Sequence, residues 1–275
     1  HADWTDASQW HVQTLKDNLR LFTPEVLGRI NQVVVGAGHD LVKNGPDEAL
    51  AVRCDSFVVE TDVHFPTDTN LLFDAVRKAI ETSAGLCDEL GLSDWRQSAY
   101  NVRCVKKAYR LTQQLKRSTA KDEDKRAERD AAIAQAHRDY LDLAESFLAR
   151  ARETRGRLHV AYRVPEMQLA SLDDYIAHGE RQIDQIDRRV LQGERIAHAE
   201  KVFSIFEPHT EWINKGKAGV VVELGLRVAV TEDQHGFLLS HRVMQQETDD
   251  QVAVPIVEAL AAQFPEVNSV SMDKG

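Results

Sequence analysis

The sequence has no apolar run that approaches the roughly 18–20 residues of a membrane-spanning helix, and it has no signal-peptide pattern. We therefore expect no membrane association and a cytoplasmic location. Only three cysteines occur, Cys54, Cys87 and Cys104, and they cannot all pair, so reduced core thiols are predicted. The 11 histidines show no zinc-motif spacing, and serine-nucleophile motifs are also missing.

Acidic residues outnumber basic ones overall, but one stretch of the chain carries positive charge only. The net charge of -10 argues against a generally nucleic-acid-binding surface, because neutralising phosphates needs clustered Lys and Arg. Between Trp95 and Lys121, however, there is no Asp or Glu. On a helix, Val102, Val105 and Tyr109 can face inward while cations lie along one side. We expect this side to follow a DNA backbone, with contacts from Arg96, Arg103, Lys106, Lys107, Arg110 and Arg117.

The first quarter of the chain changes from helical to strand-like patterns. Residues 1–46 have a helical apolar stripe, and a second helix is predicted to begin at Pro24 with Thr23 as its N-cap. Gly45-Pro46 breaks that pattern. Residues 48–65 are rich in Val and Phe and indicate a strand or a tight strand pair.

Helical periodicity dominates the middle of the chain, up to about residue 199. Thr67 or Asp68 is predicted to cap its first helix. Residues 121–157 alternate charges with alanines, which favours an exposed helical hairpin arm or a coiled-coil element.

Strand-like runs return after residue 201. We expect strands at residues 202–206, 220–230 and 237–244, with His235-Gly236 as the turn between the last two. A helix capped by Asp249 or Asp250 should follow, and Pro265 should end it before a last strand.

Two acids far apart in sequence follow apolar, strand-like runs. Asp55 ends the run that begins at Leu50, and Asp273 ends the run that begins at Ser269. An isolated acid at such a position is usually a turn former or an N-cap. Two of them suggest a split metal site, because hard divalent ions prefer carboxylate oxygens.

Two motifs that contain these acids are similar to DDE transposases of bacterial insertion sequences, whose catalytic core resembles ribonuclease H. Residues 55–68, DSFVVETDVHFPTD, resemble the family stretch D-S/T-T-V-V-E-T-N-I-H-Y-P-T-D after the first catalytic acid. The second motif is discontinuous and consists of residues 201–208 KVFSIFEP, 215–219 KGKAG, 222–225 VELG and 273–275 DKG. Asp273 stands where the family places its second acid.

The resemblance implies an α/β fold (α+β by content) with a ribonuclease H-like mixed sheet. Residues 1–46 would form an N-terminal helical segment, and residues 47–275 an incomplete core interrupted by a helical insertion at about 70–200. The predicted order of strand, strand, strand, helix and acid-bearing strand fits such a core. Because the chain begins at His1 and stops just after Asp273, we expect a fragment or truncated product.

For function, the resemblance implies metal-dependent DNA strand cleavage and strand transfer of an insertion sequence by the full-length protein. Asp55 and Asp273 would be catalytic metal ligands for Mg²⁺ or Mn²⁺, with two ions in the complete site. The family's third acid, usually a Glu on a later helix, has no place in this chain, so we expect the chain itself to be inactive. The implied partner is double-stranded DNA, both element ends and target, in the bacterial cytoplasm and nucleoid, with a possible homodimer.

Other residues of the motifs have less defined roles. Lys215 and Lys217 flank Gly216 in a loop, and they and Lys274 are predicted to contact DNA phosphates. Three further acids are expected to be structural or to support the site from outside: Glu60, Asp62 and Glu223. The sequence departs from the family at Phe57, where Thr is usual, and at Asp62, where Asn is common.

Two other functions remain open at this point. The departures and the missing acid suit a catalytically inactive DNA-binding or regulatory transposase relic. The charged helices alone would also suit a helical interaction protein unrelated to DNA.

Overall fold

The computed structural model describes four segments of the chain, residues 11–45, 48–115, 122–214 and 221–273. The chain forms two compact units, the first from residues 1–60 and 213–275 and the second from residues 61–212. Helices and a mixed sheet make the fold mixed α/β, as expected. In the described part, no helix is both long and apolar enough to cross a membrane.

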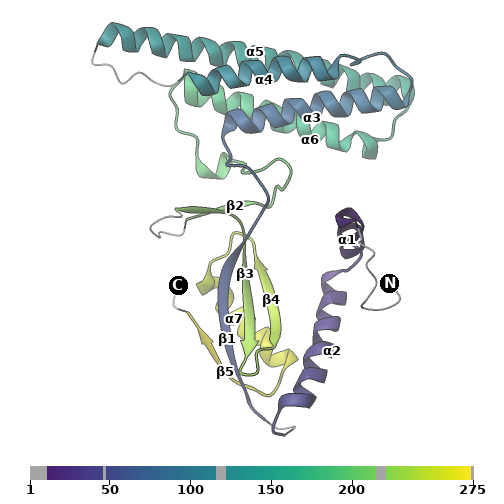
Figure 1. Ribbon diagram of the computed structural model, residues 1–275, viewed down its shortest axis with the longest axis vertical. Helices are drawn as coiled ribbons and strands as arrows, with labels where there is room; N and C mark the ends of the chain where they lie inside the picture. Colours follow the sequence, from purple (N-terminus) through teal and green to yellow (C-terminus); the bar gives the residue numbers. More distant parts are fainter. Residues whose placement is uncertain (1–10, 46–47, 116–121, 215–220, 274–275) are drawn as a thin grey trace. The chain divides into compact units, whose positions relative to one another are not determined.

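The first unit is built on a five-stranded sheet (Figure 1). Its strands are β1 (Leu50–Glu60), β2 (Glu211–Asn214), β3 (Val222–Asp233), β4 (Leu238–Met244) and β5 (Val267–Met272). The order is β2-β3-β1-β5, and β4 also pairs with the long β3. β3 runs antiparallel to β1 and β4, whereas β5 runs parallel to β1. The predicted stretch 48–65 is thus one strand rather than a pair.

The core of this unit follows the two-residue period of β1. Leu50, Val52 and Cys54 are buried, and the residues between them are exposed, as expected for a strand with one covered face. They pack with α7 (Asp249–Gln263), which contributes Val252, Ile256 and Leu260. One face of β1 therefore packs in the core of this unit.

The N-terminal helices are α1 (Val12–Leu19) and α2 (Pro24–Val42). The predicted cap is confirmed, because the Thr23 hydroxyl accepts a hydrogen bond from Val26 N at 3.3 Å. Asn31 Nδ2 donates to the carbonyl oxygens of Leu238 and Leu239 at 3.0 and 3.1 Å. α2 is thereby attached to the outer edge of β4.

Gly225 allows the closest approach between β1 and β3. It pairs with Glu60 at the end of β1, and a Cβ at Gly225 would lie 2.1 Å from the Val59 carbonyl oxygen. No side chain fits that distance, which gives a structural reason for the glycine that ends VELG in the second motif.

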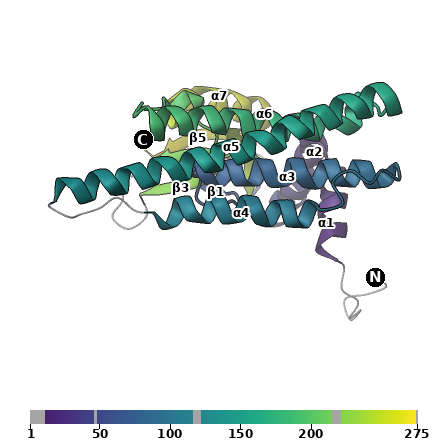
Figure 2. The ribbon, with the colours of Figure 1, turned by 90° about the horizontal axis from the view of Figure 1, so that it is seen from above.

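The second unit is a bundle of four helices, α3 (Asp68–Glu89), α4 (Ser98–Gln114), α5 (Glu123–Tyr162) and α6 (Glu166–Ile186). Figure 2 shows them lying side by side. Thr67 caps α3, as predicted, by accepting a hydrogen bond from Asn70 N at 3.2 Å. The largest fully buried side chains include Trp95, Tyr140, Leu148 and Leu158. α6 continues into a π-helical turn, Asp187–Leu191, and a 3₁₀ turn follows at His198–Glu200.

The prediction of an exposed hairpin arm or coiled-coil element at residues 121–157 is wrong. α5 is one continuous helix, and from Ala136 onward it is a bundle helix with a buried face that includes Tyr140, Ala144 and Leu148. Alternating charges identify the solvent-exposed side of a helix, but they do not show how many other helices pack against its opposite side.

The strand predicted at residues 202–206 is also wrong. The Ser204 hydroxyl accepts hydrogen bonds from Phe206 N and Glu207 N at 3.1 and 3.0 Å. This local turn competes with an extended strand, and it buries Ile205 against Leu71 and Ala75. The strand in this region is β2, which begins at Glu211.

The elements that follow agree better with the sequence. The predicted turn at His235-Gly236 joins β3 to β4, and Gly236 has φ +84°, which favours glycine. The N-cap of α7 is Thr248 rather than Asp249 or Asp250, and Gln251 Oε1 accepts a hydrogen bond from Thr248 N at 2.9 Å. The two acids instead occupy the first turn of α7, where the positive end of the helix dipole stabilises their negative charges.

Candidate functional site

Asp55 lies on β1, and Asp273 directly follows the adjacent parallel strand β5. β1 and β5 are in a register that pairs Cys54 with Met272, so the next pair in the same direction is Asp55 and Asp273. Cys54 and Met272 pack in the α7 core. Asp55 directly follows the core-facing Cys54 on β1, and Asp273 directly follows Met272, the last residue of β5.

The two acids also line the same cavity, which has a volume of about 910 Å³. Asp55 is exposed, and its Oδ1 accepts a hydrogen bond from Ser56 N at 2.8 Å. Within the described residues, β5 is the outermost strand on this side of the sheet. The acids therefore border an accessible hollow rather than the interior of a core.

Two further acids line this cavity, from the first turn of α7. Asp249 Oδ2 is 4.0 Å from Arg227 Nη1, and Asp250 accepts a hydrogen bond from the Thr248 hydroxyl. Burial raises the pKa of the Cys54 thiol, and the charges of Asp55 and Asp249 raise it further. The cavity thus has a negative potential that suits a cation.

The donor set fits a divalent ion only in part. Asp55 and Asp273 supply the carboxylate oxygens that Mg²⁺ prefers. In the part of the chain that the structure describes, no group of three or more His, Cys, Asp or Glu side chains is arranged to hold a metal. Mg²⁺ is often held by one or two carboxylates together with substrate phosphates, and the pair matches that arrangement.

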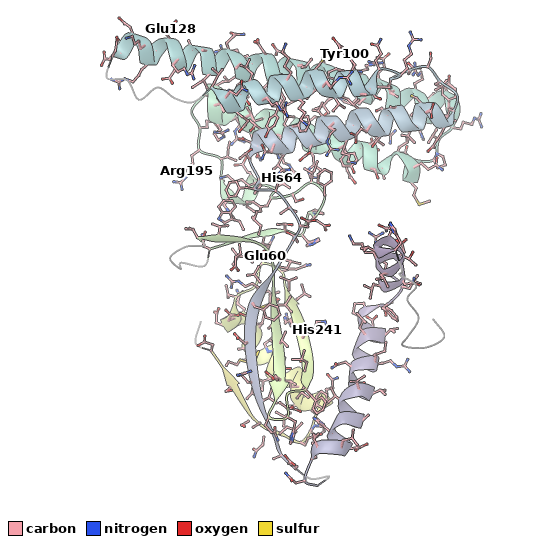
Figure 3. All side chains as sticks on the ribbon, in the orientation of Figure 1. Glu60, His64, Tyr100, Glu128, Arg195 and His241 are labelled. Atoms are coloured by element: carbon pink, nitrogen blue, oxygen red, sulfur yellow. The ribbon has the colours of Figure 1, made fainter. Side chains whose placement is uncertain are left out.

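The other acids of the motifs lie elsewhere. Glu60 is the last residue of β1 (Figure 3), and Asp62 follows the strand in the second unit. Glu223 is half-buried near the start of β3. None of the three lines the cavity, so the structure brings Asp55 together with Asp273 and with none of these acids.

Several residues of the first motif have structural contacts in the second unit. His64, which lies between β1 and α3 (Figure 3), has its Nε2 2.6 Å from Asp74 Oδ2. Thr67 caps α3, and Asp68 forms a two-point ion pair with Arg189, with distances of 2.5 and 2.9 Å. The motif therefore extends from the acid pair into the helical unit.

The basic stretch forms an exposed side of α4 and the turn before it. Val105 is buried and Val102 and Tyr109 are half-buried, as predicted, against the bundle core. Five of the predicted DNA-contacting residues are exposed: Arg96, Arg103, Lys106, Lys107 and Arg110. Among the described residues, no salt bridge involves any of these five. We call them the α4 basic stripe.

Four predicted DNA contacts lie outside the described residues: Arg117, Lys215, Lys217 and Lys274. The three cysteines are all described and all free, with Cys54 and Cys87 buried, in agreement with the predicted reduced thiols.

Sequence reasoning missed a second cavity, of about 440 Å³, in the helical unit. Its lining includes Gln182, a fully buried amide on α6. The signal was present in the sequence. Leu172, Ile176, Gly179 and Ile186 form the buried stripe of α6, and Gln182 occupies a position in that stripe where an apolar residue is expected.

Comparisons with known proteins add no relative. No protein-family model matches the chain, and neither curated proteins nor solved structures give a match. Functional inference therefore depends on the geometry above and on the motif resemblance.

Proposed function

We propose that this chain contains the first two acids of a metal-dependent DNA transposase, which cleaves the ends of an insertion sequence and joins them to target DNA. The observation that carries the proposal is the placement of Asp55 and Asp273 at one cavity, each directly after one of the paired residues Cys54 and Met272 of parallel strands β1 and β5. The two residues are far apart in sequence, and the motif resemblance that singles them out does not depend on their proximity in the fold.

The sheet supports a ribonuclease H-like identity for the first unit. The antiparallel strands β1, β3 and β4 are followed by helix α7 and by β5, which returns parallel to β1. This gives the spatial order β4-β3-β1-β5, and the sequence of three strands, a helix and a last strand before Asp273 is the order along the chain that the resemblance implies. In the chain, the helical unit comes between β1 and the short strand β2, as an insertion after the first strand would.

The chemistry expected of this arrangement depends on charge. Bound divalent ions would activate the attacking oxygen and neutralise charge at the scissile phosphate. Asp55 and Asp273 would hold such ions, and the hydrogen bond from Ser56 N would orient the Asp55 carboxylate. The nearby charges of Asp249 and Asp250 would increase the attraction for cations.

A second candidate, the inactive DNA-binding relic, is favoured by one observation. In the described residues, no third ligand joins the pair of acids. In that case the chain would bind DNA through the α4 basic stripe without cutting it.

Metal binding tests the acid pair directly in this chain. Mn²⁺ titration followed by water-proton relaxation should detect a site that weakens at least about tenfold in Asp55→Asn or Asp273→Asn, because each substitution removes one of two charged ligands. The matched control is Asp40→Asn, which changes an exposed acid of α2 in the same unit. Equal Mn²⁺ affinity in all four proteins would contradict the proposed metal site.

The α4 basic stripe makes a separate prediction for duplex DNA. Replacing Arg103, Lys106, Lys107 and Arg110 with Gln should weaken binding and lower the slope of log affinity against log salt by up to roughly 0.9 for each phosphate that is no longer neutralised. The control replaces four exposed cations of α5 that have acidic neighbours: Lys125, Arg126, Arg138 and Arg152. Anisotropy titrations at several salt concentrations measure both effects. Equal slopes for the two variants would exclude the stripe as the DNA-binding surface.

A further inference from the structure

The second cavity joins parts of both motifs that the acid pair leaves unexplained. Pro66, Thr67 and Asp68 from the first motif line it, together with Lys201, Val202 and Phe203 from the second. Its remaining walls come from Leu71 of α3, from α6 and the turns that follow it, and from Trp212. A volume of about 440 Å³ is in the range of small-ligand sites.

Gln182 gives this cavity an unused polar group. Its side chain is 0% exposed, and neither its Nε2 nor its Oε1 has a hydrogen-bond partner among the described residues. A buried amide without partners destabilises a fold, so its presence needs a reason. A ligand edge that accepts from Nε2 and donates to Oε1 would satisfy both atoms.

Aromatic rings form a continuous row at the same cavity. Phe203 lies 5.3 Å from the His198 ring and 5.8 Å from the Trp212 ring, centroid to centroid. Phe65 extends the row, with its centroid 5.4 Å from Trp212. Such rings provide the apolar faces on which nucleic acid bases stack.

The two basic side chains that line the cavity, Arg189 and Lys201, differ in whether a salt bridge already holds them. Arg189 is held by its two-point pair with Asp68. Lys201, in contrast, is exposed and no salt bridge among the described residues involves it. The neighbouring turn is fixed by Gln185, whose Nε2 donates to the Glu200 carbonyl oxygen at 2.7 Å. Lys201 is thus presented beside the aromatic row, where a phosphate that follows a bound base would lie.

We propose that this cavity binds one unpaired base of a DNA strand, with adenine as the best fit. The glutamine amide pairs with adenine at two points, accepting from N6 and donating to N7. Phe203 and Trp212 would contact the face of the base, and Lys201 its phosphate. The proposal deepens the proposed function, since it takes DNA as the substrate, but it requires neither the acids nor a metal.

The test compares short single-stranded oligonucleotides that differ at one central position, adenine or an abasic site, in metal-free buffer. The chain should bind the adenine strand about tenfold more tightly, the typical contribution of one stacked base. Gln182→Met, which removes the amide but keeps an unbranched side chain, should lose most of this preference. It should also raise the melting temperature, because the orphaned polar atoms are gone.

The matched control is Gln135→Met, on the exposed side of α5, and it should keep the adenine preference. Lys201→Ala provides a second variant that leaves the buried amide in place, and it should weaken both strands equally. Equal binding of the adenine and abasic strands by the unmodified chain would overturn the proposal, as would an unchanged preference in Gln182→Met. Adenosine 5′-monophosphate that binds as tightly as the strand would overturn the assignment to DNA.

These results are separable from the proposed function. If the chain shows no preference for the adenine strand, Mn²⁺ binding at the acid pair and duplex binding at the α4 basic stripe are still expected. If Asp55 and Asp273 bind no Mn²⁺, the adenine preference should be unchanged, because the second cavity lies within the helical unit.

Discussion

Under the proposed function, Asp55→Asn is expected to abolish metal-dependent DNA cleavage, while duplex binding stays within about twofold. Asparagine keeps the size of the side chain and an oxygen that can accept from Ser56 N, but it removes the charge that holds a divalent ion. Metal ions contribute several kcal/mol to the transition state, so the loss should be about a thousandfold or more in rate. Cleavage of labelled element ends in Mg²⁺ measures it.

Asp273→Asn should have the same effect, since the two acids directly follow the paired residues Cys54 and Met272 and line one cavity. The control is Glu60→Gln, which changes an acid of the same strand that lies outside the cavity. Its cleavage rate should stay within about twofold of the unmodified protein, with the metal site intact. Retained cleavage in either aspartate variant would exclude the assignment, whereas loss in Glu60→Gln alone would move the site to the end of β1.

Asp233→Ala is expected to cost about 3–5 kcal/mol of stability in the first unit. The Asp233 carboxylate is fully buried. Its Oδ2 lies 2.5 Å from His39 Nε2, and its Oδ1 accepts hydrogen bonds from His235 N and Phe237 N at 2.9 and 3.0 Å. Alanine leaves all three donors without this acceptor, and it releases both the β3–β4 turn and the end of α2.

Two buried thiols allow this loss to be measured in each unit separately. Burial raises the pKa of Cys54 in the first unit and of Cys87 in the second, so both react slowly until their unit opens. Thiol labelling in increasing urea, read by mass spectrometry, should show lower protection of Cys54 in Asp233→Ala and unchanged protection of Cys87.

Two variants complete the Asp233 experiment. Asp233→Asn should lose less, about 1–2 kcal/mol, because its amide oxygen can still accept from the turn. Glu232→Ala, which removes an exposed pair with Arg53, should cost below about 1 kcal/mol. If Asp233→Ala and Glu232→Ala had equal effects, the buried network would not hold the unit together.

Local patterns in the sequence were enough for many elements. Thr23 and Thr67 were predicted as caps because a hydroxyl before a helical pattern can accept from a free backbone N–H, and both do so. The inward side of α4 was also predictable, because Val102, Val105 and Tyr109 recur at helical spacing.

The failures arose where local pattern and packing disagree. Residues 202–206 are a short, mostly apolar run like a strand, but the Ser204 hydroxyl forms a turn and Ile205 is buried against α3. The charges of residues 121–157 suggested an arm, although Tyr140 and Leu148 belong to the bundle core. Alternation indicates which side meets water and leaves the number of packing partners undetermined.

By itself, the sequence determined the main helices, the three longest strands and the identity of the two acids as candidates, since these depend on residues near one another in the chain. Only the tertiary structure decided that Asp55 and Asp273 border one cavity, because that follows from the pairing of β1 with β5. It also revealed the unpaired amide of Gln182 beside the aromatic row. Whether a buried polar atom finds a partner depends on segments that converge only when the chain folds.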